Sequence, residues 1–290
     1  MFVTGCSTLE TVTFQNDDTK YINKIAILGP EQSKEIRVNI TGDTNMMRLL
    51  MGPAIIPQIM LAFATHQANN DEAIYLGDLM FDFNIEEILR EKFKNELEAN
   101  TYFKPVLQNE ISDNAEIRKI LSKLTKDRND YITIAQNMDA DTIIELSVYS
   151  YGIKDPGIRW DPNVILTVDV KMIRVVDNKT LWQTRTTENT KREATGMYYA
   201  VYRENNAELL RFELEAAAEI VAKTLVQDLG FEIKEGISDV REIVIERLAK
   251  ALEEYNDSYQ SSPLPFQNNA IGIRGRMSPR NLNSMIKRRW

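Results

Sequence analysis

The sequence predicts an α/β (α+β) fold in which a mixed β-sheet is flanked by helices. Residues 141–153 and 164–176 alternate apolar and polar side chains, as half-buried strands do. Residues 205–230 instead carry apolar side chains at helical spacing. Strand and helix patterns follow one another between residues 21 and 230, an order typical of layered folds that combine helices with a sheet.

The N-terminal part predicts two strands and an inserted apolar segment. Residues 21–30 read as a strand closed by Gly29-Pro30, and residues 35–41 as a shorter strand. An insertion of about 44–80 follows, whose apolar stretch 46–64 contains Arg48 and two prolines. Prolines remove backbone donors within a helix, so we expect a buried, kinked helical insertion here and not a membrane span.

An amphipathic helix is predicted over 85–97. Asn84 precedes it as the N-cap and Glu87 follows three residues later, as in a capping box. Its apolar residues fall on one face: Ile85, Ile88, Leu89, Phe93 and Leu97. Residues 102–108 then predict a strand, at a sheet edge because Pro105 lacks a backbone donor. Further helices are expected at 115–124 and 131–138.

The central strands form a predicted hairpin. The turn lies at 177–180, in "DNKT", and 181–187 is the returning strand. One face of the strand before the turn carries Val164, Leu166, Val168, Val170 and Met172. We expect the opposite face, with Thr167, Asp169 and Lys171, to be solvated. The acidic pairs Glu86-Glu87 and Glu253-Glu254 are also expected on solvated helix faces.

The C-terminal part predicts a long helix, a second helix and an extended arm. The long helix ends at Gly230, and its buried stripe is Leu210, Leu214, Ala217, Val221 and Leu225. A second helix covers 236–258. The basic arm, 259–290, lacks periodicity and has no acidic residue. It carries the chain's C-terminal cations Arg274, Arg276, Arg280, Lys287, Arg288 and Arg289, with Trp290 last.

Composition argues against several functional classes. The net charge of −8 does not suggest nucleic-acid binding. One cysteine, Cys6, excludes an internal disulfide or a thiolate metal cluster, and one histidine, His66, excludes motifs that need two. No phosphate-binding loop or nucleophile-elbow motif occurs in the chain. We therefore expect no cofactor and no metal.

The stretch Val3-Thr4-Gly5-Cys6 resembles a bacterial lipobox. The resemblance implies cleavage before Cys6, acylation of that residue and, because Ser7 follows it, the outer membrane, with the chain facing the periplasm. Two or three acyl chains suffice for stable anchoring. Because only five residues precede Cys6, we expect a longer leader upstream. The alternative is a cytosolic protein with a chance cysteine.

The order of elements, with Ala140-Asp141 before a strand that carries Ser147 and Tyr151, resembles one periplasmic domain family. This domain is shared by CsgG-type curli-secretion lipoproteins, LpoB-type cell-wall synthase activators and the N-terminal domain of TolB. The "D-x-x-T" turn and its aliphatic-Trp pair match at 177–182. The resemblance covers roughly residues 21–230. We expect a tether at 1–20, a periplasmic domain at 21–235, an added helix at 236–258 and the arm at 259–290, the last two being additions to the family pattern.

Members of these families assemble with partners and do not catalyse. The resemblance thus implies a structural lipoprotein subunit of an envelope complex, a secretion-system core such as a Dot/Icm-like type IV system, with other subunits or copies of itself as partners. The alternatives are an LpoB-like regulator and an unrecognised enzyme. Tyr198, Tyr199 and Tyr202 are expected either in a contact patch or over the domain's own core. The basic arm is expected to bind an acidic neighbouring subunit.

Overall fold

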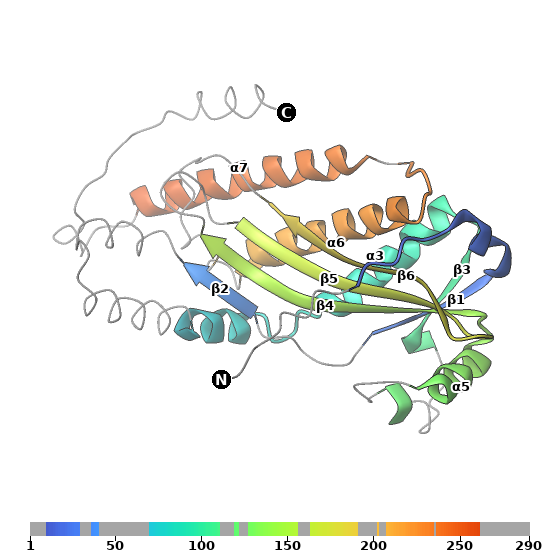
Figure 1. Ribbon diagram of the computed structural model, residues 1–290. Helices are drawn as coiled ribbons and strands as arrows, with labels where there is room; N and C mark the ends of the chain where they lie inside the picture. The colour runs from blue at the N-terminus through green and yellow to red at the C-terminus, as the bar shows by residue number, and fades with distance from the viewer. Residues whose placement is uncertain are drawn as a thin grey trace, which may run out of the picture.

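The computed structural model describes residues 10–29, 36–40, 70–110, 119–121, 127–155, 163–190, 202, 207–234 and 236–261. A mixed sheet flanked by helices confirms the predicted α/β class (Figure 1). The strands are β1 (Lys24–Leu28), β2 (Ile36–Ile40), β3 (Lys104–Leu107), β4 (Thr142–Asp155), β5 (Asn163–Arg174) and β6 (Lys179–Asn189). Their order is β3-β1-β4-β5-β6, and β2 also pairs with β4.

The long strand β4 organises the sheet. Its first residues pair in parallel with β1, and its last five, from Tyr151, pair in parallel with β2. On its other side β4 runs antiparallel to β5, which continues into β6 through a turn where Asn178 adopts a φ of 58°. β3 pairs only with β1, so the edge position predicted from Pro105 is confirmed.

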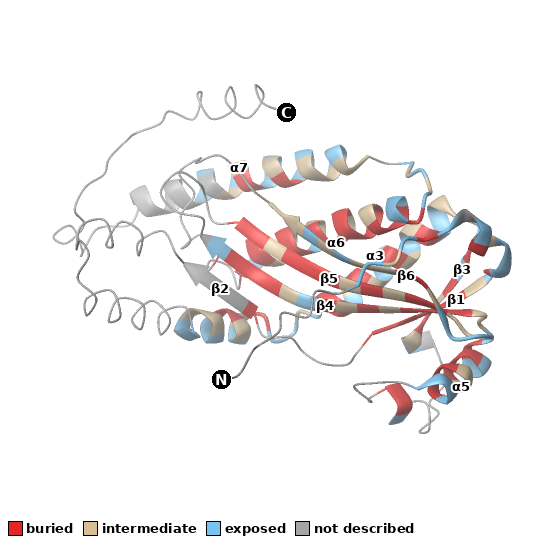
Figure 2. Cartoon of the chain, viewed as in Figure 1, coloured by how far each residue is buried: buried red, intermediate tan, exposed pale blue. Residues whose placement is uncertain are grey.

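Helices cover both faces of the sheet unequally (Figures 1 and 2). α3 (Ile85–Asn100) and α6 (Glu208–Asp228) pack on one face, and α7 (Ile237–Ser261) packs on α6. α5 (Arg128–Met138) covers the other face at the start of β4. Short 3-10 turns, η1 (Asn16–Tyr21) and η2 (Gln108–Glu110), lie beside the sheet. The predicted cap is confirmed, since the Asn84 side chain accepts from the Glu87 N–H at 3.2 Å.

The main core lies between the sheet and the α3–α6 pair. The predicted stripe of α6 is buried throughout, and Val168 and Trp182 belong to the same core. Gly230 adopts a φ of 84° just after α6, as predicted for a helix end. A smaller core beneath α5 joins Ile134 to Ile143 and Ile173 of the sheet. Because both cores include residues of β4 and β5, these two strands lie at the centre of the domain.

Charged side chains also enter the layer between α3 and α6. The Lys223 side chain is 2% exposed and its Nζ lies 2.8 Å from Glu96 Oε1. Lys92 and Glu219 pair at 2.8 Å between the same helices. The prediction for Glu86 was wrong, because this residue is only 7% exposed, while Glu87, Glu253 and Glu254 are exposed as expected. Position 86 lies in the first turn of α3 and faces the sheet.

Two predicted boundaries change. The tether expected to reach residue 20 is already folded from Glu10, since Val12 exchanges two 2.9 Å backbone hydrogen bonds with Gln183 of β6 and Phe14 lies in the main core. α7 continues to Ser261, three residues into the predicted arm. The apolar stretch 46–64 lies outside the described residues, while 70–79 are helical as expected. Among the described helices, none combines the length and apolarity that crossing a bilayer requires.

Of the faces expected to be solvated, that of β5 is only partly so. Asp169 and Lys171 are half-buried, whereas Thr167 is 8% exposed. Its hydroxyl is within hydrogen-bond distance, 3.1 Å, of the Thr187 hydroxyl on β6.

Candidate functional site

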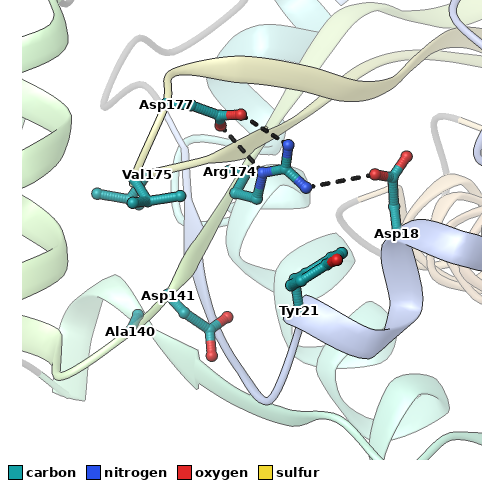
Figure 3. A pocket seen from close by; sticks show the side chains of 8 residues that line it. Asp18, Tyr21, Ala140, Asp141, Arg174, Val175 and Asp177 are labelled. Carbon is teal, nitrogen blue, oxygen red and sulfur yellow. Dashed lines mark hydrogen bonds and ion pairs between the residues drawn. The ribbon is translucent and has the colours of Figure 1, made fainter.

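A charged cleft of about 710 Å³ opens at the end of the sheet where β4 begins and β5 ends (Figure 3). It is formed by η1, the residues before β4, the end of β5 and the β5–β6 turn. Its lining consists of Asp18, Tyr21, Ala140, Asp141, Arg174, Val175, Val176 and Asp177. Both motifs that carry the family resemblance therefore contribute to one cleft.

Asp141 connects the beginnings of two strands. Its Oδ2 accepts from the backbone N–H groups of Asn23 and Lys24 at 3.0 and 3.1 Å, and its Oδ1 accepts from the Thr142 hydroxyl at 2.9 Å. A carboxylate that accepts from backbone donors makes strong, charge-assisted hydrogen bonds. The Ala-Asp motif thus sets where β1 meets β4.

Arg174 connects the hairpin to η1. Its guanidinium donates to both carboxylate oxygens of Asp177, at 3.0 and 2.6 Å, and lies 3.4 Å from Asp18 Oδ1 (Figure 3). The hydrogen bond from Arg174 lowers the pKa of the Asp177 carboxyl to about 2. Asp177 also accepts from the Lys179 N–H at 3.2 Å, so this side chain fixes the turn.

The polar side chains that line the cleft are bound to one another or to the backbone. Each of the three carboxylates already accepts hydrogen bonds from protein donors. No group of three or more residues that could hold a metal ion occurs within the described ranges. Tyr21 and Val176 are 64% and 75% exposed at the rim. Exposed apolar side chains beside fixed charges are typical of surfaces that bind another macromolecule.

A second polar surface lies on the sheet face away from α3 and α6. Tyr149 is 44% exposed at the bulge of β4, and the Arg185 guanidinium lies 3.9 Å from its ring centroid. Arg185 also makes a bidentate pair with Asp169, at 2.5 and 2.7 Å. The side chains on this face are held in place by one another, which gives the face a defined shape.

The residues predicted for partner binding have different outcomes. Tyr202 is not in a contact patch: it is fully buried, and its hydroxyl donates to Glu213 Oε1 at 2.7 Å. Of the two alternatives left open for it, a place in the domain's own core is the correct one. Cys6, Tyr198, Tyr199 and the cations of the basic arm lie outside the described residues.

Sequence reasoning missed the charged cleft as a unit. Asp18 and Arg174 are 156 residues apart, and no local pattern marks either one. The signal that could have found part of it is the turn motif, since Asp177 was already singled out. Asp141, which lines the same cleft, was also singled out. The reason was its match to a family motif, and nothing in the sequence indicated that it lies near Asp177.

Comparisons with known proteins give distant structural similarities only. No family model and no curated protein matches the chain. Among solved structures, the hypothetical protein CT253 from Chlamydia trachomatis has 10% identity and a TM-score of 0.35, covering 77% of this chain and 98% of that one. Lipoprotein GNA1162 from Neisseria meningitidis has 8% identity and a TM-score of 0.29, covering 72% and 98%.

The LpoB C-terminal domain from Salmonella enterica has 10% identity and a TM-score of 0.22, covering 58% of this chain and 83% of that one. The similar structures thus include bacterial lipoproteins. With TM-scores below 0.5, these similarities support no conclusion about function.

Proposed function

We propose that this chain is a non-enzymatic structural subunit of a multiprotein complex of the outer membrane and periplasm, a secretion-system core, anchored by acyl chains on Cys6. The lipobox resemblance at residues 3–6 supports the anchor. The domain resemblance at residues 140–182 supports the assembly role.

The observation that carries the proposal is the short connection between Cys6 and the folded body. The Gln183 side chain donates to the Glu10 carbonyl oxygen at 2.8 Å, and Val12 pairs with Gln183 just after it. Only residues 7–9 then separate the proposed lipid from the edge of β6. At roughly 3.3–3.6 Å per residue, the body lies within about 15 Å of the anchor.

This short reach favours a structural subunit over a regulator. A lipid-anchored regulator that acts on a synthase across the periplasm needs a long tether. A connection of three residues instead fixes the domain beside the bilayer, with the β6 edge toward it. That placement suits a subunit that builds part of a membrane-adjacent assembly.

The hydrogen bonds in the charged cleft also favour a structural role for the chain. Asp141 and Asp177 are the two acidic residues of the family motifs. Their carboxylate oxygens accept hydrogen bonds from backbone N–H groups and from the Arg174 guanidinium. Their place in the motifs is thereby explained by strand and turn geometry. The exposed rim of Tyr21 and Val176 remains for contact with a partner.

A spacer insertion tests the proposal against the regulator alternative. We would insert about 15 Gly and Ser residues between Thr8 and Leu9, which adds about 20 Å of average reach. The matched control places the same spacer after Trp290. A structural subunit should lose co-purification with its envelope complex only when the spacer is N-terminal, while remaining membrane-bound. Undiminished co-purification with the N-terminal spacer would favour the regulator and contradict the proposal.

A further inference from the structure

The two outer strands of the sheet differ in how their edges are protected. β3 is four residues long and contains Pro105, and both features discourage the addition of another strand. β6 is the outer strand on the other side (Figure 1), and its last six residues, "TRTTEN", contain neither proline nor lysine. An edge without such protection is able to pair with the strand of another chain.

The direction of the β6 backbone groups follows from the contact with Val12. Gln183 exchanges two 2.9 Å backbone hydrogen bonds with Val12, so its N–H and C=O groups point away from β5. In an antiparallel strand these directions alternate from one residue to the next. The backbone groups of Arg185, Thr187 and Asn189 therefore point outward too, and among the described residues none pairs with them on this side.

The side chains at this edge carry charges that are neutralised within the chain. Arg185 and Thr187 are exposed, and exposed residues occur along β6 in Figure 2. The Arg185 guanidinium pairs with both carboxylate oxygens of Asp169, while Glu188 accepts from Arg241 of α7 at 3.1 and 3.2 Å. An edge whose cation and anion are both paired internally suits a neutral strand, and an identical edge is such a strand.

The edge is complementary to itself. When the β6 strands of two copies run antiparallel with Thr187 opposite Thr187, Arg185 of each copy lies opposite Asn189 of the other. All three outward-pointing residues of each strand are then in hydrogen-bonded pairs, which exchange about six backbone hydrogen bonds in total. The central pair of threonines is a favourable cross-strand contact. A register shifted toward Gln183 loses a pair, because Val12 already occupies that residue.

A second copy also brings a strand that is already ordered. β5 pairs with β6 from Lys179 to Asn189, so the edge keeps its extended shape before any partner arrives. A flexible peptide would lose conformational entropy on binding, whereas two preformed edges lose little. Val12 lies beside the paired segment, so the connection to Cys6 leaves each copy close to the junction. Anchoring both copies in one bilayer would raise their effective concentration further.

We infer that the edge of β6, residues 185–189, is a homodimer interface through which two copies of this chain join their sheets into one. The two-fold axis passes between the paired Thr187 residues. The inference rests on the proposed assembly role, and it names a second copy as one partner together with the edge that binds it.

Sedimentation of the full-length chain, with Cys6→Ser to prevent acylation, measures the association. We expect a dimer whose dissociation constant rises at least about tenfold in Thr187→Pro, because proline removes an outward N–H that pairs with no described residue of the monomer. The matched control Thr187→Val keeps the N–H and a strand-forming side chain, so its dissociation constant should stay within about twofold of the parent's. Circular dichroism of both variants checks that they fold.

A disulfide tests the register without removing a backbone donor. In the same Cys6→Ser chain, Thr187→Cys places two thiols opposite each other with Cα atoms about 5.5 Å apart, so mild oxidation should give a covalent dimer. The control Thr186→Cys, one residue away, places its Cα atoms about 8 Å apart, beyond disulfide range, and should stay uncrosslinked.

Three results would overturn the inference. They are a parent chain that stays monomeric up to about 1 mM, a dimer that a folded Thr187→Pro variant leaves intact, and faster cross-linking at position 186 than at position 187. Each concerns the unacylated chain in solution. The acylation of Cys6 and the spacer test of the proposed function are therefore decided independently of them.

Discussion

Removing the Asp141 carboxylate should destabilise the domain because this side chain holds the beginning of β1 against β4. In Asp141→Ala the Asn23 and Lys24 N–H groups lose their acceptor, at present 3.0 and 3.1 Å away. The Asn23 donor is exposed and can turn to water, whereas the Lys24 donor is half-buried. A hydrogen bond to a charged group contributes about 1.5–3 kcal/mol, and a buried unpaired donor costs about 1–3 kcal/mol.

The expected loss in free energy of unfolding is therefore about 2–4 kcal/mol for Asp141→Ala. Asp141→Asn keeps one carbonyl oxygen for both N–H donors but loses the charge and the oxygen that accepts from the Thr142 hydroxyl, so it should cost about 1 kcal/mol, less than alanine. The matched control is Asp139→Asn, because this side chain is 95% exposed and makes a 3.4 Å pair with Lys24. It should change stability by less than about 0.5 kcal/mol.

Urea unfolding followed by circular dichroism gives these three differences directly. The ranking Ala, then Asn, then the Asp139 control tests the geometry and not only the presence of a carboxylate. If Asp141→Ala unfolds within about 0.5 kcal/mol of wild type, or if Asn costs as much as Ala, the reasoning about the strand junction is wrong.

Three further predictions concern the core, the turn and the arm. Trp182→Ala should lower the free energy of unfolding in urea by about 3–5 kcal/mol, because the side chain is 2% exposed. A decrease below about 1 kcal/mol would contradict the place of Trp182 in the core. Since the Asp177 pKa falls to about 2 in the folded state, the stability it contributes is complete above its unfolded pKa of about 3.9 and is lost as pH falls toward 2. Asp177→Asn should therefore flatten the change in melting temperature between about pH 4 and 2, and an unchanged slope would count against the Arg174 pairing. Deleting residues 262–290 should leave the domain folded and acylated but reduce its recovery with the assembled complex, measured by affinity capture at rising salt; recovery equal to wild type would exclude the arm from assembly.

Local patterns predicted the elements because burial follows side-chain periodicity. The α6 stripe, the Asn84 cap and the β5–β6 turn each depend on residues a few positions apart, and each is present. Pro105 predicted an edge strand because proline has no backbone N–H to donate to a second neighbouring strand. Such features need no knowledge of distant partners.

The parts that could not be predicted depend on contacts between distant segments. The pairing of Val12 with Gln183 makes the expected tether part of the domain, and it joins the N-terminal residues to a strand far along the chain. Tyr202 follows two other tyrosines, so its sequence context suggested a patch. Only its partner Glu213, a buried acid on α6, places it in the core.

The charged cleft shows the same limit for function. The family resemblance could identify Asp141 and Asp177 as residues of interest. It could not predict which groups their carboxylates bind in the structure. Those contacts depend on Asn23 and Lys24, at the beginning of β1, and on Arg174, the last residue of β5, which bind the two carboxylates.

The central claim is that Cys6 anchors this domain beside a membrane as part of an assembly. Its most direct test is the mass of the N-terminal peptide of the mature protein, purified from cells that make it naturally, with a Cys6→Ser chain as control. We predict a peptide that begins at Cys6 and carries two or three acyl chains, and a control that carries none and leaves the membrane fraction. A wild-type peptide with an unmodified Cys6 would contradict the account.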